Sequence, residues 1–186
     1  MELRAAHLCK AYGPRRVLED VSFTAGEGLL CLMAPSGRGK TTLLRLLLGL
    51  ELPDSGTITG PARWAAVFQE DRLLEHLDAA GNLRFALGAD FDRKKAAELM
   101  TFLGLDPEDR RPASAYSGGM KRRLALARCL LAEAEAIALD EPFTGLDRES
   151  RERAMTAVRR AAEGKLVLLV THDPADARGA RVLRLD

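Results

Sequence analysis

The sequence predicts an α/β fold in which a mostly parallel sheet is covered on both faces by helices and carries a helical insertion. Short apolar runs alternate with amphipathic helical stretches along most of the chain, which is the pattern of parallel sheets. Between about residues 75 and 113 the alternation stops and helical spacing takes over, as at Ala96, Met100 and Leu103. The length of 186 residues suits one domain with a sizeable buried core.

The first third of the chain is predicted to be rich in strands. A loop containing Tyr12-Gly13-Pro14 separates the first two strands, and a turn at Pro53-Asp54-Ser55-Gly56 precedes a later one. A helix is expected over residues 41–50, shortly after an apolar run that ends at Met33. The predicted strands cover residues 3–10, 17–24, 29–33, 57–59 and 64–68.

Helices and buried strands alternate again in the last third of the chain. Gly104 ends the helical insertion, and Asp106-Pro107 begins a loop. Further on, Gly164 closes an exposed helix whose arginines and glutamates are expected to form a solvated face. The other predicted elements are helices over residues 120–133 and 150–163 and strands over 137–139, 166–170 and 182–185.

Composition excludes several classes of protein. The 28 Lys and Arg residues nearly balance 27 Asp and Glu, and no long basic block suggests a nucleic-acid surface. Cys9, Cys31 and Cys129 are odd in number and lack metal-site spacing, so reduced thiols of a cytosolic protein are expected. The start has no signal-peptide core, and no apolar run approaches the ~20 residues needed to cross a bilayer. We expect a chain that is soluble by itself.

The most informative motif is a glycine-rich loop between a predicted strand and a predicted helix. Its backbone N–H groups would form a concave anion site, to which the helix N-terminus adds its positive dipole end. Lys40 is expected to reach the terminal phosphates and the Thr41 hydroxyl to bind Mg²⁺. Ala34 stands where the pattern has a glycine, and its methyl costs little if its φ is negative. The predicted phosphate-binding residues are Ala34, Pro35, Ser36, Gly37, Arg38, Gly39, Lys40, Thr41 and Thr42.

Two adjacent carboxylates, Asp140 and Glu141, follow the strand predicted at 137–139. Alone, such a pair is typical of a solvated turn. Open α/β sheets bind ligands at the carboxyl ends of their strands, so beside a phosphate-binding loop the pair indicates a functional site. Asp140 is expected to hold Mg²⁺, directly or through water. Glu141 is expected to polarise the attacking water toward the γ-phosphate, as a general base or an orienting acceptor.

A second glycine-rich turn, Ser117-Gly118-Gly119, precedes the helix predicted at 120–133. Alone, it is typical of an N-cap serine followed by flexible glycines. It is also a second potential anion site at a helix N-terminus. One nucleotide site does not need two such turns in one chain, whereas a site shared between two subunits does.

Together these motifs resemble the nucleotide-binding domain of the ATP-binding cassette (ABC) family over nearly the whole chain. Residues 34–42 resemble its Walker A motif, and residues 137–141 its Walker B motif with the catalytic glutamate. Tyr116-Ser117-Gly118-Gly119-Met120 is similar to the family signature Leu-Ser-Gly-Gly-Gln. Four further matches are Tyr12 with the aromatic that stacks on adenine, Gln69 with the Q-loop, Asp147 with the D-loop and His172 with the switch histidine.

The resemblance implies a P-loop NTPase core with an N-terminal antiparallel β portion and an inserted helical subdomain. We expect one nucleotide-binding domain over 1–186, with the core at about 1–74 and 119–186 and the helical subdomain at about 75–118. It also implies an Mg-dependent ATPase in which two cassettes, identical or different, pair head to tail around two ATP molecules.

Roles for single residues follow from the same resemblance. Catalysis would depend on Lys40, Gln69, Glu141 and His172, and Mg²⁺ would be held by Thr41, Gln69 and Asp140. Asp147 would link the two sites across the interface. The residues expected to contact ATP in trans are Ser117, Gly118, Gly119 and Met120.

A narrower resemblance concerns residues 67–74 and 116–123, which are most similar to the ATPases of nitrate/sulfonate/taurine-type importers. It implies transmembrane permease subunits and a solute-binding protein as partners, no nucleic acid, and a cytoplasmic location on the inner face of the membrane. The alternative is a soluble ABC-type mechanochemical ATPase acting on DNA or ribosomes. The DNA-repair type carries a long coiled-coil insertion and the translation type fuses two cassettes, so the transporter is favoured here.

Overall fold

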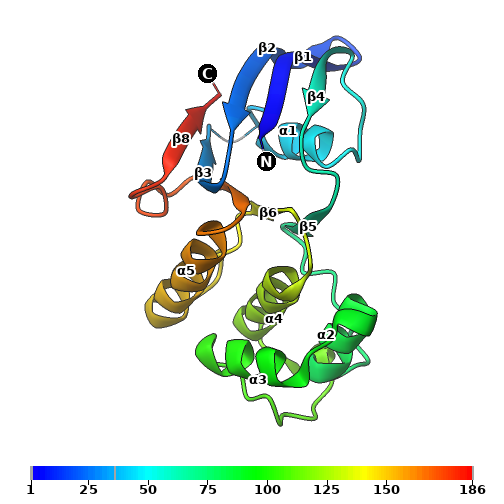
Figure 1. The fold of residues 1–186 in the computed structure, drawn as a ribbon, viewed down its shortest axis with the longest axis vertical. Helices are drawn as coiled ribbons and strands as arrows, with labels where there is room; N and C mark the ends of the chain where they lie inside the picture. Colours follow the sequence, from blue (N-terminus) through cyan, green and yellow to red (C-terminus); the bar gives the residue numbers. More distant parts are fainter. Residues whose placement is uncertain (1, 36, 186) are drawn as a thin grey trace. The chain divides into compact units, whose positions relative to one another are not determined.

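The computed structural model describes residues 2–35 and 37–185, and its chain divides into two compact units. Unit 1 contains the residues up to Trp64, Glu135–Asp140 and the residues from Ala162 onward. Unit 2 contains Ala65–Ala134 and Glu141–Ala161. The helical subdomain expected at about 75–118 lies within unit 2, and its limits stay a prediction. Figure 1 shows the strands of unit 1 and the helices of unit 2.

Unit 1 begins with an antiparallel sheet. Strands β1 (Leu3–Tyr12), β2 (Arg15–Ala25) and β4 (Ser55–Thr59) pair in the order β2-β1-β4. Along β1 the side chains of Leu3, Ala5 and Leu8 are buried, and the register shifts between Ala5 and Leu8 mark a bulge at His7, whose φ is 53°. The resemblance had implied an antiparallel N-terminal portion, and this prediction is confirmed.

A parallel sheet forms the core of unit 1. Strands β3 (Gly28–Met33), β6 (Ala136–Asp140), β7 (Leu166–Val170) and β8 (Arg181–Arg184) lie in the order β6-β7-β3-β8. Every residue of β6 and β7 is buried, as expected for central parallel strands. Helix α1 (Lys40–Leu47) follows β3 and buries one face through Leu43, Leu44, Leu46 and Leu47. Strand β5 (Trp64–Val67) leads from unit 1 into unit 2.

Unit 2 is predominantly helical. Its α-helices are α2 (Ala79–Leu87), α3 (Arg93–Phe102), α4 (Gly118–Leu131) and α5 (Arg148–Ala162), and single 3₁₀ turns span Gly88–Asp90 and Ala113–Ala115. Leu83, Met100, Leu103, Leu124 and Leu126 are among its fully buried side chains. Helices fill less of residues 75–113 than the sequence predicted. Gly88, with a φ of 56°, ends α2, a break that the sequence did not predict. Gly104, with a φ of 71°, follows α3, and residues 105–112 form a loop, so the predicted helix end at Gly104 and the loop beginning at Asp106 are confirmed.

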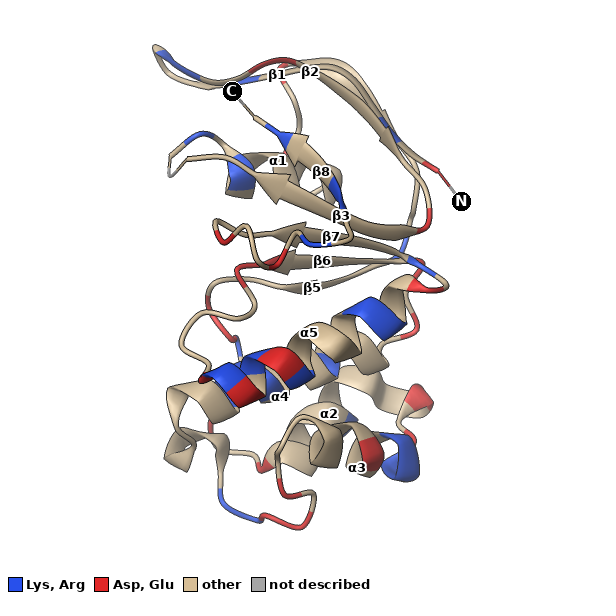
Figure 2. Cartoon of the chain, turned by 90° about the vertical axis from the view of Figure 1, so that its left-hand side faces the viewer, with Lys and Arg blue, Asp and Glu red and all other residues tan. Residues whose placement is uncertain are grey.

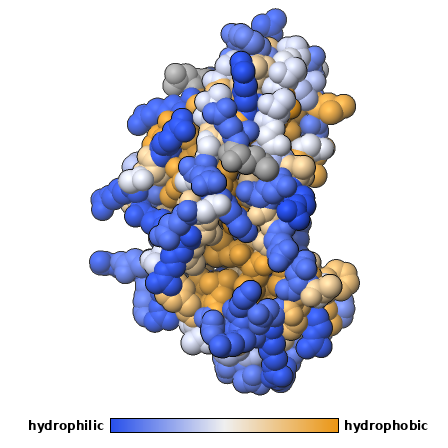
Figure 3. All heavy atoms as spheres, viewed as in Figure 1, coloured by the Kyte–Doolittle hydropathy of each residue, from blue (hydrophilic) through white to orange (hydrophobic). Residues whose placement is uncertain are grey.

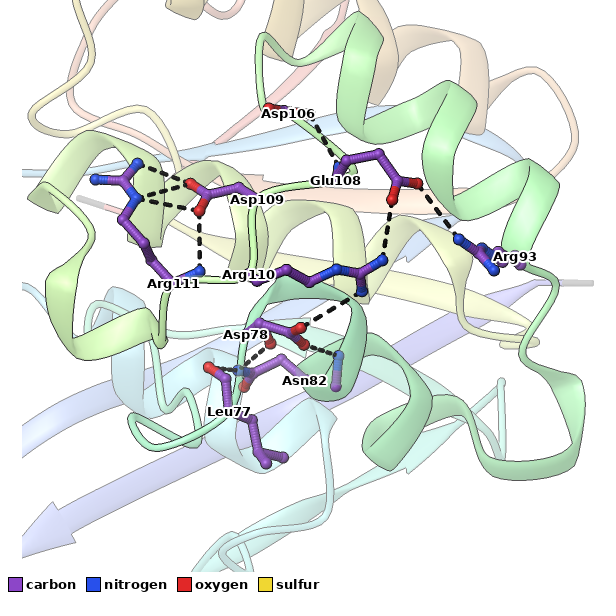
Figure 4. A network of polar contacts seen from close by, with 10 residues as sticks. Leu77, Asp78, Asn82, Arg93, Asp106, Glu108, Asp109, Arg110 and Arg111 are labelled. Atoms are coloured by element: carbon purple, nitrogen blue, oxygen red, sulfur yellow. Dashed lines mark hydrogen bonds and ion pairs between the residues drawn. The ribbon is translucent and has the colours of Figure 1, made fainter.

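Polar contacts fix the loops of unit 2 (Figure 4). Asp78 caps α2 by accepting a hydrogen bond from the Gly81 amide over 2.7 Å, and it lies 3.7 Å from the Arg110 guanidinium. Arg110 also pairs with Glu108, which in turn faces Arg93 on α3 at 3.4 Å. The loop before α4 is therefore tied to both α2 and α3.

The surface is polar over most of the face drawn in Figure 3. Lysines or arginines and acidic residues mix along α5 (Figure 2), where Arg148–Glu152 and Arg153–Glu149 pair one turn apart. The predicted solvated helix face is confirmed. Among residues 2–35 and 37–185, no helix is both long and apolar enough to span a bilayer.

Candidate nucleotide-binding site

The glycine-rich loop runs from the end of β3 at Met33 into α1. Gly37 and Gly39 have φ values of 78° and 81°, a region that favours glycine. A Cβ on Gly39 would lie 2.9 Å from both the Val17 carbonyl oxygen and Leu18 Cδ2, so only glycine fits this position. Ser36, which was predicted to bind phosphate, lies outside the described residues.

Ala34 replaces the motif's first glycine without backbone strain. The described non-glycine residues with positive φ are His7, Asp20, Arg72 and Glu141. Ala34 is not among them, so its methyl group causes no backbone strain, which is the condition under which the substitution is expected from the sequence to cost little.

Lys40 folds back over this loop. Its Nζ donates hydrogen bonds to the Ala34 carbonyl over 2.7 Å and the Pro35 carbonyl over 3.1 Å, and the residue is buried. The N-terminus of α1 has no side-chain cap and no acidic residue in its first turn. Helix N–H groups, the helix dipole and a lysine ammonium therefore meet at one place, which is the chemistry of a phosphate site.

Thr41 and Asp140 join the loop to the parallel sheet. The Thr41 hydroxyl donates a hydrogen bond of 3.1 Å to Asp140 Oδ2 at the carboxyl end of the buried strand β6. A hydroxyl and a carboxylate are hard oxygen donors of the kind Mg²⁺ accepts, together with phosphate oxygens and waters. Among the described residues, no group of three or more His, Cys, Asp or Glu side chains is placed to hold a metal ion. The donor set fits Mg²⁺.

Tyr12 lies at the end of β1 and is 46% exposed. Its hydroxyl donates a hydrogen bond to Glu51, which raises the pKa of the Tyr12 phenol and lowers that of the Glu51 carboxyl. The Thr42 side chain opposes this rise in the pKa of Tyr12. The phenol is thus anchored while its ring is accessible.

A groove of about 810 Å³ lies beside the glycine-rich loop in unit 1. Arg15, Arg38 and Arg184 line it together with Glu19 and Asp20. Arg15 Nη2 donates a hydrogen bond to the Gly37 carbonyl over 3.1 Å, so β2 supports the loop as well.

His172 is exposed and follows β7 in unit 1. The turn that carries it is fixed by Thr171, whose hydroxyl donates to the buried Asp176 over 2.7 Å and accepts from the Asp173 amide over 3.1 Å. The predicted histidine therefore stands at the carboxyl end of a central parallel strand, as Asp140 does.

The remaining predicted residues belong to unit 2. Glu141 is half-buried and has a φ of 49°, an uncommon conformation for a glutamate that often marks functional sites. Gln69 has an exposed side chain, and its carbonyl accepts a hydrogen bond from Arg122. Neither the buried Arg122 nor its contact with Gln69 was foreseen, although an arginine among the apolar residues of α4 was a usable signal.

Ser117 is the N-cap of α4, and its hydroxyl accepts a hydrogen bond from the Met120 amide over 3.2 Å. The interpretation of Ser117 as the N-cap of a helix is therefore correct, and an N-cap serine is compatible with an anion site at the same helix end. Ser117 and Gly118 are exposed, no atom lies within 4 Å of a Cβ built on Gly118, and the first turn has no acidic residue. Tyr116 is buried, which raises the pKa of its phenol, and it lies beside Arg111.

Asp147 precedes α5 and hydrogen-bonds to Ser150 twice. Its carboxylate accepts from the Ser150 amide over 2.9 Å and from the Ser150 hydroxyl over 2.8 Å, and both bonds lower its pKa. The expected D-loop aspartate thus caps a helix in this chain.

Comparison with known proteins agrees with this arrangement. Residues 18–144 match the family model described as ABC transporter. The chain is 38% identical over its whole length to an aliphatic sulfonates import ATP-binding protein SsuB 2 of Burkholderia cenocepacia, covering 73% of that protein. It is 40% identical over 96% of its length to an SsuB 1 protein of Nocardia farcinica, covering 76% of that protein.

A solved structure shares the fold. It is the "Structure of ATP binding subunit of ABC transporter", which superposes with a TM-score of 0.88 over the whole of this chain and 86% of the other, at 24% identity. The α/β fold predicted from the sequence is confirmed. The chain therefore belongs to the ABC transporter family, among its ATP-binding subunits, which are ATPases.

Proposed function

We propose that this chain energises an importer by binding and hydrolysing ATP with Mg²⁺. The observation that carries the proposal is the grouping of the Lys40 ammonium, the uncapped start of α1 and the Thr41–Asp140 hydrogen bond at one edge of the parallel sheet. The direction of transport rests on relatives whose names describe import ATP-binding proteins.

Within unit 1, Lys40 would exchange the carbonyls of Ala34 and Pro35 for the terminal phosphates of ATP. Thr41 and Asp140, with Gln69 from unit 2, would hold Mg²⁺. Bound there, the cation would neutralise charge that develops on the phosphates. Tyr12 would stack on adenine, since its ring is accessible and its hydroxyl is anchored to Glu51.

Two groups would act on the reaction itself. Glu141 would orient the attacking water and accept its proton, and His172 would stabilise charge on the γ-phosphate in the transition state. The left-handed backbone of Glu141 supports this role, because strained conformations persist where a side chain must be aimed.

The catalytic unit would be a pair of cassettes. The exposed Ser117 and Gly118 and the half-buried Gly119 and Met120 would close over ATP bound to the other copy, and Asp147 would lie at that interface. The partner copy is either identical or a related cassette. Transmembrane permease subunits and a solute-binding protein would complete the transporter at the cytoplasmic face of the membrane, where unit 2 would receive a coupling helix.

Two variants of the purified chain test the proposal. Glu141→Gln is expected to bind ATP with Mg²⁺ normally, to accumulate as an ATP-bound dimer, and to turn over about 10²–10⁴-fold more slowly than wild type. Wild-type turnover in Glu141→Gln would remove Glu141 from this role. Ser117→Arg is expected to abolish dimerisation and turnover while leaving ATP binding to the monomer intact. If dimerisation and turnover both survived, the shared-site account would fail.

A pull-down from solubilised membranes addresses the alternative, a soluble mechanochemical ATPase. Recovery of integral membrane proteins supports the transporter. Recovery of DNA or ribosomes, with no integral membrane partner, would favour the alternative.

A further inference from the structure

The segment after β5, residues 68–75, is held along its length by cationic side chains of α4. Arg122 Nη1 donates to the Phe68 carbonyl over 2.7 Å, and Nη2 donates to the Gln69 carbonyl. One turn and a half further along α4, Arg128 donates to the carbonyls of Asp71 and Arg72 over 2.9 and 2.7 Å. Helix α4, whose N-cap is Ser117, thus carries the two arginines that donate hydrogen bonds to four carbonyls of this segment.

Arg122 is the central member of this set. It is only 8% exposed, and a buried guanidinium is tolerated only where its charge and N–H groups are matched. Besides the two carbonyls it faces Asp71 Oδ1 at 3.1 Å, although the pair is not aligned for a hydrogen bond. Burial raises the pKa of the Asp71 carboxyl, and the charge of Arg122 opposes that rise.

The segment's other contacts leave it little freedom within unit 2. Arg72 has a φ of 48°, and its guanidinium stacks over the Phe68 ring at 4.2 Å. Lys121 pairs with Glu75 at 3.0 Å. The Glu75 carbonyl accepts from the Ser114 amide over 2.9 Å, which connects the segment to the turn that leads into Ser117.

We propose that Arg122 is a positioning residue, which fixes the backbone of Gln69 to the helix that presents Ser117. The proposal rests on the function assigned above, in which Gln69 and Ser117 both act on nucleotide. Because one side chain on α4 bonds the Gln69 carbonyl directly, the Gln69 side chain and the N-terminus of α4 move as one body.

The planar guanidinium of Arg122, with its two terminal N–H groups, is suited to holding the Phe68 and Gln69 carbonyls together. Two N–H groups in a fixed plane reach two successive carbonyls at once, whereas a lysine ammonium is a single point on a flexible stem. Arg122→Lys should keep the charge near Asp71 and lose the fixed spacing of the two bonds. Arg122→Gln should lose both. The matched control is Arg93→Gln, which removes an exposed arginine of the same unit and its 3.4 Å pair with Glu108.

The experiment measures ATP turnover, ATP binding, thermal unfolding and amide hydrogen exchange of the full chain. Arg122→Gln is expected to lower kcat by about 10- to 100-fold, the loss that follows from misplacing a reacting group by about 1 Å. KM for ATP should stay within about twofold, since Lys40 and the start of α1, which are proposed to hold the phosphates within one chain, lie in unit 1. Amides of residues 69–72 should exchange faster. Arg122→Lys should fall between, and Arg93→Gln should match wild type.

Two outcomes would overturn the proposal. One is a wild-type kcat for Arg122→Gln with only a lower thermal midpoint, because that would make Arg122 purely structural. The other is unchanged exchange at residues 69–72, because the arginine would then not hold the segment. A wild-type chain without turnover would contradict the proposed function instead, and the exchange comparison would still decide whether Arg122 fixes Gln69.

Discussion

The Thr41 hydroxyl donates a hydrogen bond to Asp140 across 99 residues of sequence, with 3.1 Å between the oxygens. Thr41 stands in the first turn of α1, and Asp140 is the last residue of β6. In the parallel sheet β7 separates β6 from β3, the strand that leads into the glycine-rich loop. The fold therefore brings the two oxygen donors together without any local sequence link between them.

Asp140→Asn should weaken the use of Mg²⁺ without emptying the nucleotide site. The amide keeps an acceptor for Thr41 but removes the negative charge, and bonds to charged groups contribute about 1.5–3 kcal/mol. The Mg²⁺ concentration for half-maximal turnover is therefore expected to rise about 10- to 100-fold. Binding of ATP in the presence of a chelator should match wild type. A Mg²⁺ titration identical to that of wild type would remove Asp140 from the metal site.

Gly39→Ala tests the closeness of the glycine-rich loop to β2. The new Cβ would lie 2.9 Å from the Val17 carbonyl oxygen in a residue whose φ is 81°, so backbone has to shift. Such strain costs on the order of 1–3 kcal/mol. Urea unfolding should report this loss, together with weaker ATP binding. The control is Gly164→Ala, which has open space around its Cβ and no positive φ and should keep wild-type stability and affinity.

Asn82→Leu is expected to destabilise unit 2. The buried Asn82 amide donates to the carbonyls of Leu74, Leu77 and Asp78, and its oxygen accepts from the Leu74 amide over 2.8 Å. Leucine satisfies none of these groups, and each buried polar group left unpaired costs about 1–3 kcal/mol. Chemical denaturation should show a loss of at least that size. Phe85→Ala, at a residue that is 72% exposed on the same helix, should change stability by less than about 0.5 kcal/mol.

The sequence predicted those features that depend on neighbours along the chain. The strand before the glycine-rich loop and the helix after it follow from an apolar run, glycines and helical spacing. The Ser117 cap follows from a serine two glycines before a helical pattern. The break between α2 and α3 was missed, because the insertion's apolar spacing continues through the glycine that interrupts it.

Contacts between distant segments could not be predicted in the same way. No periodicity relates Arg122 to the Gln69 carbonyl, since the loop of residues 68–72 has no regular spacing of its own. The fold of Lys40 over the Ala34 and Pro35 carbonyls depends likewise on the path of a loop without repeating geometry. Asn82 is a polar residue on the apolar face of α2. This position indicates that its amide has a buried hydrogen-bond partner, but the sequence does not identify that partner.

Gly118→Ala distinguishes an effect on the stability of the single chain from an effect on a nucleotide site shared between two copies. A Cβ on Gly118 meets no atom of this chain within 4 Å, and its φ is not positive, so alanine should be accepted without loss of stability. If ATP bound to a second copy approaches this turn closely, the added methyl would displace it. Turnover and ATP-driven dimerisation should then fall about 10-fold or more, since a misplacement of about 1 Å can cost 10²-fold. ATP binding to the monomer and the thermal midpoint should match wild type. The methyl at Gly118 faces open space in the single chain, so only an approaching second molecule can sense it, and unchanged turnover would mean that none comes so close.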